Sequence, residues 1–385
     1  MSNWSDRVAE IESFKVMDLL KRAKELDAMG HDVVHMCAGE PDFATPEPIA
    51  EAGIAAIRAG HTQYTPAAGI PQLREAIAGF YQQRYGLDIP AERVIVTAGA
   101  SGALLMVFST LANPGQTFMM ADPGYPCNPR FLRLIEARGQ LVPTDAGDNY
   151  QLTPELIEQN WQPNTAGVLL ASPANPTGSV VPREQLELIS QTVRANRGHL
   201  VVDELYHGLT YGFDATSVLE VDQDAFVLNS FSKYFGMTGW RLGWTVVPDA
   251  AVADIERLAQ NLFISPPTIA QHAALAAFEP ETLDILEARR EAFRERRDLL
   301  VNGLRELGFG IPLTPEGAFY VYADASHLTD NTFDLCWELL EQDKIAVTPG
   351  VDFGEHRANQ FIRFSYTTGI EQIEKMLTRL KYRFN

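Results

Sequence analysis

Short runs of β-branched and aliphatic residues alternate with longer, helix-like segments through the middle of the chain. In one such segment Leu186, Leu188 and Ile189 are apolar positions at roughly helical spacing. Strands separated by helices in this way are typical of a mostly parallel sheet with helices on both faces. The apolar runs predict strands over residues 93–97, 117–121, 167–171, 199–203, 225–229 and 243–247.

The pattern changes after Pro280. A long charged helix is predicted over 281–307, followed by short strands over 319–323 and 361–365 and by a final helix that begins at Ile370. Helices combined with a few short strands indicate a second, smaller α+β unit.

The first residues of the chain are expected to join that smaller unit. A helix is predicted over 13–29, with Ser13 as its cap, and a chain can leave one domain and return to it. We therefore predict an N-terminal segment over 1–44 that joins the small domain, a large domain over 45–280 and a small C-terminal domain over 281–385.

The composition is that of an ordinary globular protein, because 46% of the 385 residues are hydrophobic and 21% are charged. The formal charge of -19 and the absence of a basic run argue against a partner made of nucleic acid. The N-terminus has no apolar signal core, and the longest apolar run, near 104–108, is far too short to cross a bilayer. We expect no membrane partner and a cytoplasmic location.

Cysteines and histidines give no sign of a metal site or a disulfide framework. Cys37, Cys127 and Cys336 are scattered without a ligand-like spacing. His31 and His35 lie beside a strand-like run rather than on a clear helix. We therefore expect free thiols and no metal.

The most distinctive chemistry lies in residues 230–244. Lys233 lies between Ser232 and aromatic residues, and Arg241 follows in a glycine-rich stretch. A lysine can form a Schiff base with a carbonyl cofactor, and a guanidinium with hydroxyl donors can hold a phosphate. The simpler interpretation of a single lysine is a solvated surface charge.

A second motif, residues 97–103, follows a strand and opens an apolar helix. The amides of Ala100, Ser101 and Gly102 would lie at the start of that helix, which favours an anion. A tight turn that needs small residues for packing is an equally good explanation of this motif alone.

Three further polar positions also follow predicted strands. Asp203 ends one strand with Tyr206 close behind, a pair that suits a cationic ring nitrogen and a phenolic oxygen of the same ring. Asn175 lies between two prolines, and Tyr125 is placed where a flat cofactor would stack. Each also has a structural explanation: a capping Asp, a plain turn or a core aromatic.

Together, these motifs resemble the class I aminotransferases in their order and spacing. These enzymes belong to the class I and II group and have PLP fold type I. The resemblance covers nearly the whole chain and rests on residues 39–43, 64–66, 99–102, Tyr125, 175–178, 203–206, 230–241 and 361–365. It implies an α/β fold with a large domain, in which a mostly parallel mixed sheet lies between helices, and a smaller α+β domain.

The resemblance also implies pyridoxal 5′-phosphate (PLP) as the cofactor. Lys233 would form the Schiff base with PLP, and Asp203 would keep the pyridine nitrogen protonated. Tyr206 and Asn175 would bond the ring 3-oxygen, and Tyr125 would stack on the ring. In these roles Lys233, Asp203 and Tyr206 are the implied catalytic residues.

The resemblance assigns the remaining polar groups to the phosphate and to the substrate. The phosphate would be held by Arg241, Ser230, Ser101, Gly102 and the amide of Ala100, with Tyr64 reaching across the interface of a homodimer that shares its active sites. The α-carboxylate of the substrate would be bound by Arg363, Asn175 and the amide of Gly39.

The implied reaction is ping-pong transamination between an amino acid and a 2-oxo acid. Some aspartate-specific relatives have a lysine where this chain has Ser101, and residues 262–267 are largely apolar. We therefore expect a neutral substrate, aliphatic or aromatic, with Phe14 and Val16 as apolar contributors. A PLP-dependent β-lyase or racemase and an aspartate aminotransferase remain alternatives.

Two more distant alternatives come from other classes of protein. Residues 230–233 match the S-x-x-K of some serine hydrolases, and 99–103 nearly match a nucleophile elbow, but no partner motif or downstream histidine accompanies them. A non-enzymatic regulator would need an added DNA-binding module, whereas the aminotransferase pattern already begins by Ser13.

Overall fold

The computed structural model describes residues 5–384, and its largest sheet has seven strands. Their order is β2 (Val94–Thr97), β8 (Gly243–Val246), β7 (Phe226–Ser230), β6 (His199–Asp203), β5 (Thr165–Ala171), β3 (Thr117–Asp122) and β4 (Arg138–Pro143). β8 is antiparallel to both neighbours, whereas the other neighbouring strands are parallel. Every strand predicted for this sheet is present. β4 was not predicted, because it is a half-exposed edge strand that lacks an apolar run.

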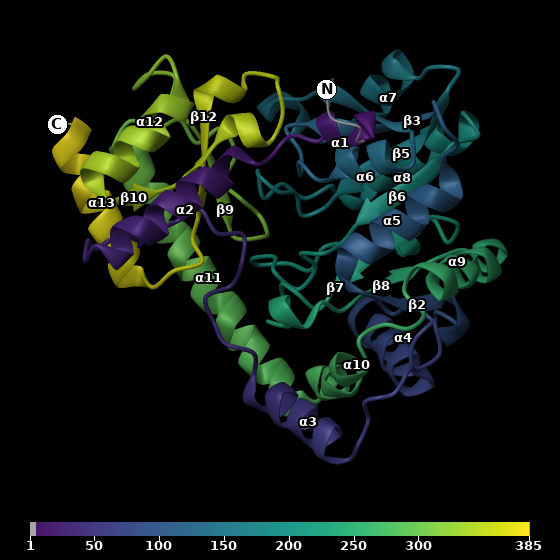
Figure 1. Ribbon diagram of the computed structural model, residues 1–385. Coiled ribbons are helices and arrows are strands. Elements are labelled where there is room, and N and C mark those ends of the chain that lie inside the picture. The colour runs from purple at the N-terminus through teal and green to yellow at the C-terminus, as the bar shows by residue number, and fades with distance from the viewer. Residues whose placement is uncertain (1–4, 385) are drawn as a thin grey trace.

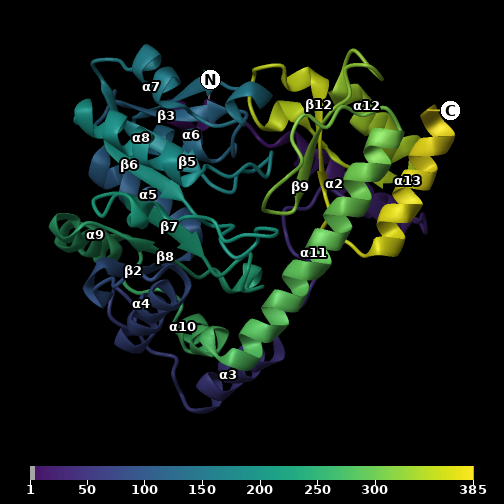
Figure 2. The same ribbon diagram turned by 180° about the vertical axis from the view of Figure 1, so that it is seen from behind.

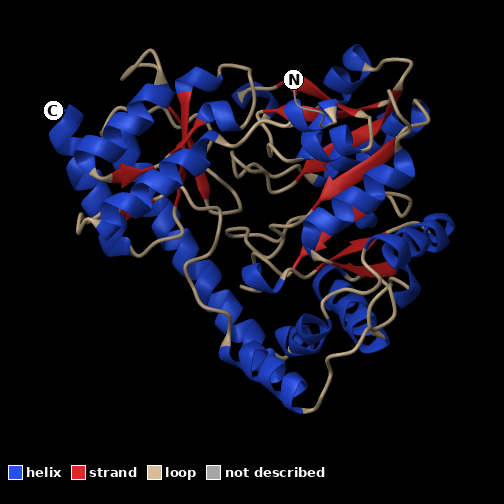
Figure 3. Ribbon diagram, viewed as in Figure 1, coloured by secondary structure: helices blue, strands red, loops and turns tan. Residues whose placement is uncertain are grey.

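Helices cover both faces of the sheet, as Figure 3 shows. Val168 and Leu170 of β5 belong to one hydrophobic cluster, which includes residues of α8 (Arg183–Ala195). Leu169, between them, belongs to a second cluster with residues of α5 (Gly99–Leu111). Successive side chains of a strand point to opposite faces, so a strand buried on both sides is apolar throughout.

Eight further α-helices precede residue 280 in the described part of the chain, and not all of them pack on this sheet. They are α1 (Asp6–Ala9), α2 (Lys15–Ala28), α3 (Glu47–Arg58), α4 (Pro71–Tyr85), α6 (Asn128–Leu134), α7 (Pro154–Asn160), α9 (Asp249–Leu262) and α10 (Thr268–Leu275). α10 packs against α3 and α4, and the three lie together in Figure 1.

A smaller antiparallel sheet follows, in the order β11 (Thr348–Pro349), β12 (Phe361–Ser365) and β9 (Tyr320–Asp324). Its helices are α11 (Pro280–Glu306), α12 (Thr332–Glu338) and α13 (Ile370–Phe384). α11 contacts α3 near one end and β9 and α13 towards the other, so it runs from the region of α3 and α10 to the smaller sheet in Figures 1 and 2. The predicted long helix, short strands and final helix are all present.

The N-terminal segment is divided: Arg7 of α1 pairs with Glu136, which follows α6, whereas the residues from α2 onward lie against the smaller sheet. β1 (Val34–His35) pairs in parallel with β10 (Ile345–Ala346), and α2 contacts β10 and β11. The prediction that Ser13 caps α2 was wrong. The carboxylate of Asp352 accepts hydrogen bonds from the amides of Lys15 and Val16, at 2.7 and 2.8 Å. That cap comes from a distant part of the chain, so a local pattern could not reveal it.

The domain boundaries at 44/45 and 280/281 stay a prediction. Between Ser5 and Phe384, no helix is both long enough and apolar enough to cross a membrane.

Candidate active site

The polar motifs meet at one edge of the large sheet. The parallel strands β2, β3, β5, β6 and β7 all end at this edge, and antiparallel β8 begins there. A cavity of about 340 Å³ opens at the edge, within the range of small-molecule sites. Its lining includes the predicted site residues Gly39, Ala100, Ser101, Tyr125, Asn175, Asp203, Tyr206, Ser230, Lys233, Arg241 and Arg363.

Two predicted site residues lie outside this lining. Gly102 is buried in α5, where a Cβ atom would lie 3.6 Å from both Ala98 and Phe263, an ordinary packing distance. Tyr64 is 80% exposed, in the loop between α3 and α4. A contact of Tyr64 with a partner subunit stays a prediction. The apolar pair Phe14 and Val16 does line the cavity.

Lys233 and Asp203 are the titratable pair of the cavity. The Lys233 Nζ donates a hydrogen bond to the Gly39 carbonyl at 2.6 Å, and burial lowers the pKa of Lys233 to about 8. Burial raises the pKa of Asp203 to about 6, although the amide of Leu205, 3.0 Å from Oδ1, and Lys233 oppose that rise. An amine with a lowered pKa is a better nucleophile near neutral pH.

One end of the cavity suits an anion. Gly99, at the start of α5, has a positive φ of 73°, and a Cβ atom there would lie 2.8 Å from the Arg241 Nη2. A Cβ atom on Gly243 would lie 3.0 Å from the amide nitrogen of Ala100. Ser230 Oγ lies 3.1 Å from the Leu242 carbonyl. Because these glycines leave no side chain in between, guanidinium, hydroxyl and helix amides converge on one small space.

The other end suits a carboxylate. Arg363 of β12 is buried, with Nη1 donating to Asn175 Oδ1 at 2.9 Å and Nη2 donating to the Cys37 carbonyl at 2.8 Å. Its guanidinium carbon lies 4.3 Å from the ring centroid of Tyr320 and 4.8 Å from that of Phe353. Its Nε is buried and has no hydrogen-bond partner among residues 5–384. A bound carboxylate would accept a hydrogen bond from this nitrogen. A buried donor without an acceptor costs free energy.

Comparison with known proteins agrees with this geometry. The family described as aminotransferase class I and II matches residues 31–380. The chain belongs to this family. It is a PLP-dependent transaminase of fold type I, and its substrates are amino acids and oxo acids.

Relatives cover essentially the whole chain. A valine–pyruvate aminotransferase of Mycobacterium tuberculosis is 38% identical over 381 residues, which cover 98% of each chain. The crystal structure of an aminotransferase from the same organism superimposes with a TM-score of 0.96 at 36% identity, covering 100% of this chain and 99% of the other. The aspartate aminotransferase of Thermus thermophilus with maleate gives a TM-score of 0.93 at 35% identity, with coverage of 99% and 100%.

The side chains present fit PLP. A cavity with an anion-binding end, a buried carboxylate and a lysine of lowered pKa offers a partner for each polar group of that cofactor. Tyr206 adds a phenol, and burial raises its pKa well above the usual value, so it stays protonated and can donate. Tyr125, raised in pKa by burial as well, adds a flat ring on the cavity wall.

Sequence reasoning missed several residues that shape the aminotransferase site. Tyr320, Phe353, Asp352 and Thr348 all line the cavity, and none was singled out. For Tyr320 a signal existed. β9 and β12 are antiparallel with Tyr322 opposite Arg363, so Tyr320, two residues away, is on the same face as Arg363. The sequence alone does not reveal this relationship, because it depends on the pairing of β9 with β12.

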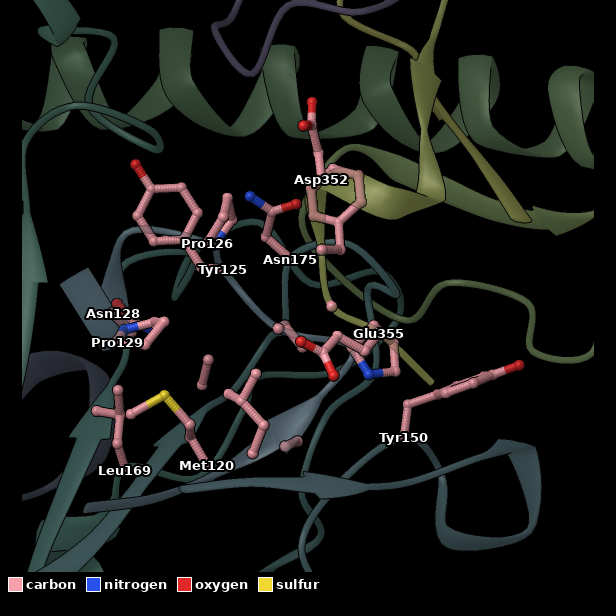
Figure 4. A pocket seen from close by; sticks show the side chains of 18 of the residues that line it. Met120, Tyr125, Pro126, Asn128, Pro129, Tyr150, Leu169, Asn175, Asp352 and Glu355 are labelled. Atoms are coloured by element: carbon pink, nitrogen blue, oxygen red, sulfur yellow. The ribbon is translucent and has the colours of Figure 1, made fainter. Parts of the chain in front are cut away.

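A second cavity, of about 210 Å³, adjoins the first. Tyr125, Asn175 and Asp352 line both cavities, and Met120 and Leu169 belong to the mainly apolar wall of the second (Figure 4). The side chains that border the candidate active site therefore also border this neighbouring space.

Proposed function

We propose that this aminotransferase transfers the amino group of a neutral L-amino acid, aliphatic or aromatic, to a 2-oxo acid. One observation carries the proposal: Arg363, buried with an Nε that has no partner in the described part of the chain, shares a cavity with Lys233 and Asp203. A carboxylate bound by the guanidinium places the substrate in the same cavity as the lysine that moves its proton.

When bound, PLP supplies the carbonyl carbon that takes up the amino group and an electron-withdrawing ring that stabilises negative charge at the substrate α-carbon. Lys233 Nζ would hold the cofactor and, as a free amine, would accept the proton of the substrate α-carbon. Its pKa of about 8 lets the free amine act as a base near neutral pH. The Asp203 carboxylate pairs with the ring nitrogen and holds the proton there.

The remaining roles follow the two ends of the cavity. We assign the phosphate to Arg241, Ser230, Ser101 and the amide of Ala100, all in the lining, while a contact of Gly102 with the phosphate stays a prediction. Tyr206 and Asn175 bond the ring 3-oxygen, and Tyr125 packs on the ring. Arg363, Asn175 and the amide of Gly39 bind the substrate carboxylate.

The cavity wall supports a neutral side chain. Among the described residues, Lys233, Arg241 and Arg363 are the only basic ones in the lining, and each already has a role. Phe14 and Val16 add apolar surface. The relative named valine–pyruvate aminotransferase agrees with this choice, whereas the relative named aspartate aminotransferase is the main rival.

The first half-reaction tests the substrate class. PLP-loaded protein is mixed with L-valine, L-phenylalanine or L-aspartate without an acceptor, and the cofactor absorbance is followed in a stopped-flow instrument. We expect a neutral amino acid to react faster than aspartate by about tenfold or more. Faster reaction with aspartate contradicts the proposal. A β-lyase would instead release pyruvate and ammonia from L-serine O-sulfate faster than it transfers amino groups.

We further propose a homodimer in which Tyr64 reaches the phosphate of the partner's site. Tyr64 is 80% exposed, and Thr268 of α10 holds its loop by donating to the Gln63 carbonyl at 2.7 Å. Light scattering should give twice the chain mass, and Tyr64→Phe should weaken PLP binding. A monomer, or unchanged PLP affinity in the variant, contradicts this arrangement. The cytoplasmic location stays a prediction.

A further inference from the structure

Tyr320 touches one residue proposed to bind the cofactor ring and one proposed to bind the substrate. It lies buried in β9 and lines the main cavity. Its hydroxyl oxygen is 2.8 Å from the Tyr206 hydroxyl oxygen, and the centroid of its ring is 4.3 Å from the guanidinium carbon of Arg363. The same side chain therefore borders the proposed partner of the cofactor ring and the proposed partner of the substrate carboxylate.

Hydrogen-bond counting assigns a direction to the Tyr206–Tyr320 contact. Burial raises the pKa of both phenols, so each keeps one proton. If Tyr206 uses its hydroxyl hydrogen to donate a hydrogen bond to the ring 3-oxygen of the cofactor, it cannot also donate one to Tyr320. Tyr320 must then donate to the Tyr206 oxygen. A phenol that accepts a hydrogen bond is polarised and donates more strongly in turn.

The position of Tyr320 is tightly fixed. A Cβ atom on Gly39 would lie only 2.8 Å from its hydroxyl oxygen, so this hydroxyl is packed against the backbone that receives Lys233. Its ring attracts the guanidinium of Arg363 electrostatically. Contact with a flat ring restricts the orientation of the guanidinium plane, on which bidentate carboxylate binding depends.

We propose that Tyr320 is a positioning residue that couples the partner of the cofactor ring to the carboxylate-binding end of the site, its hydroxyl strengthening the hydrogen bond that Tyr206 donates and its ring orienting Arg363. This inference rests on the roles proposed above for Tyr206 and Arg363.

Two variants separate the hydroxyl from the ring. Tyr320→Phe removes only the hydroxyl, whereas Tyr320→Leu removes both. In PLP-loaded protein, the first readout is the pH midpoint of the cofactor absorbance. The second is the dissociation constant of 3-phenylpropanoate, a carboxylate without an amino group. Neither readout depends on turnover.

The expected results differ between the two variants. A weaker hydrogen bond leaves the ring 3-oxygen more basic, so Tyr320→Phe should raise the pH midpoint by about 0.5 to 1 unit. Because the ring remains, carboxylate binding should stay within about twofold of the original protein. Tyr320→Leu should raise the midpoint in the same way and also weaken carboxylate binding by about fivefold or more.

Tyr211→Phe is the matched control, because Tyr211 is also buried and donates its hydroxyl to the Ala318 carbonyl at 2.5 Å, yet does not line the cavity. Neither readout should move in this variant. An unchanged midpoint in Tyr320→Phe, or an equal shift in Tyr211→Phe, overturns the coupling. Failure of the unsubstituted protein to take up PLP overturns the proposed function itself. Normal uptake with unresponsive Tyr320 variants overturns only the coupling.

Discussion

The anion-binding end and the carboxylate-binding end of the cavity are assembled in different ways. The first uses two segments of one sheet edge, 99–101 after β2 and 230–241 between β7 and β8. The second brings Cys37, Asn175, Tyr320 and Arg363 together from separate parts of the chain. Backbone geometry, with glycine at the contacts, defines the first end. Packing between the two sheets defines the second, and substitutions should therefore affect the two ends separately.

Arg363→Lys should have the largest effect and should be confined to the carboxylate end. A lysine cannot make both of the hydrogen bonds that Arg363 donates to Asn175 and to the Cys37 carbonyl. It also lacks the planar guanidinium that binds a carboxylate through two parallel hydrogen bonds. We expect kcat/KM to fall by about 100-fold, mainly through KM, with the cofactor absorbance unchanged. Steady-state kinetics measure this. Arg257→Lys, at an exposed position of α9, is the control. Loss of bound cofactor in Arg363→Lys would show that the ends are not separate.

Gly243→Ala should damage the opposite end. An added Cβ atom would lie 2.7 Å from the Asn229 carbonyl and 2.9 Å from the carbonyl carbon of Gly99, and neither backbone can move cheaply. We expect the PLP dissociation constant to rise about tenfold and the free energy of unfolding to fall by about 1–3 kcal/mol.

Gly239→Ala is the control for that variant, because no atom of the described residues, apart from its chain neighbours, lies within 4 Å of its added Cβ. Equilibrium titration with PLP and thermal unfolding measure the two effects. If both glycine variants behave alike, close packing at the start of α5 does not shape the anion-binding end.

The pH dependence of PLP uptake should report the environment of Lys233. Its pKa is lowered to about 8, so the fraction of neutral, reactive amine increases as the pH rises towards that value and levels off above it. Between pH 7 and pH 9 the rate of covalent uptake should rise about tenfold and level off, whereas a lysine of ordinary pKa would give about 100-fold with no levelling. Stopped-flow absorbance distinguishes the two curves. A rise of about 100-fold would show that Lys233 is not buried as described.

Asp352→Ala should give the smallest effect, again at the carboxylate end. It removes the cap of α2, the helix that carries Val16 to the cavity wall. We expect stability to fall by about 1 kcal/mol and the KM for a neutral amino acid to rise about threefold, with PLP affinity unchanged. Asp352→Asn keeps an acceptor oxygen, so both the loss of stability and the rise in KM should be smaller. Equal losses in both variants would exclude capping as the cause.

The same contrast explains what the sequence could and could not predict. Lys233, Asp203 and the start of α5 lie at or just after the ends of apolar strands. The alternation of strands and helices along the chain was therefore enough to place them at one sheet edge. Tyr320 and Asp352 act through pairings between segments far apart in sequence, which no local pattern encodes. β4 escaped notice because a half-exposed edge strand needs no continuous apolar run.

The central claim is that Lys233 is the residue to which the cofactor attaches. The direct measurement is to load the protein with PLP, reduce it with sodium borohydride, digest it and locate the pyridoxyl group by mass spectrometry. We predict a single modified lysine, Lys233, and no modification when Lys233→Ala is treated in the same way. Modification of another lysine in the unsubstituted protein, or none at all, would contradict the account.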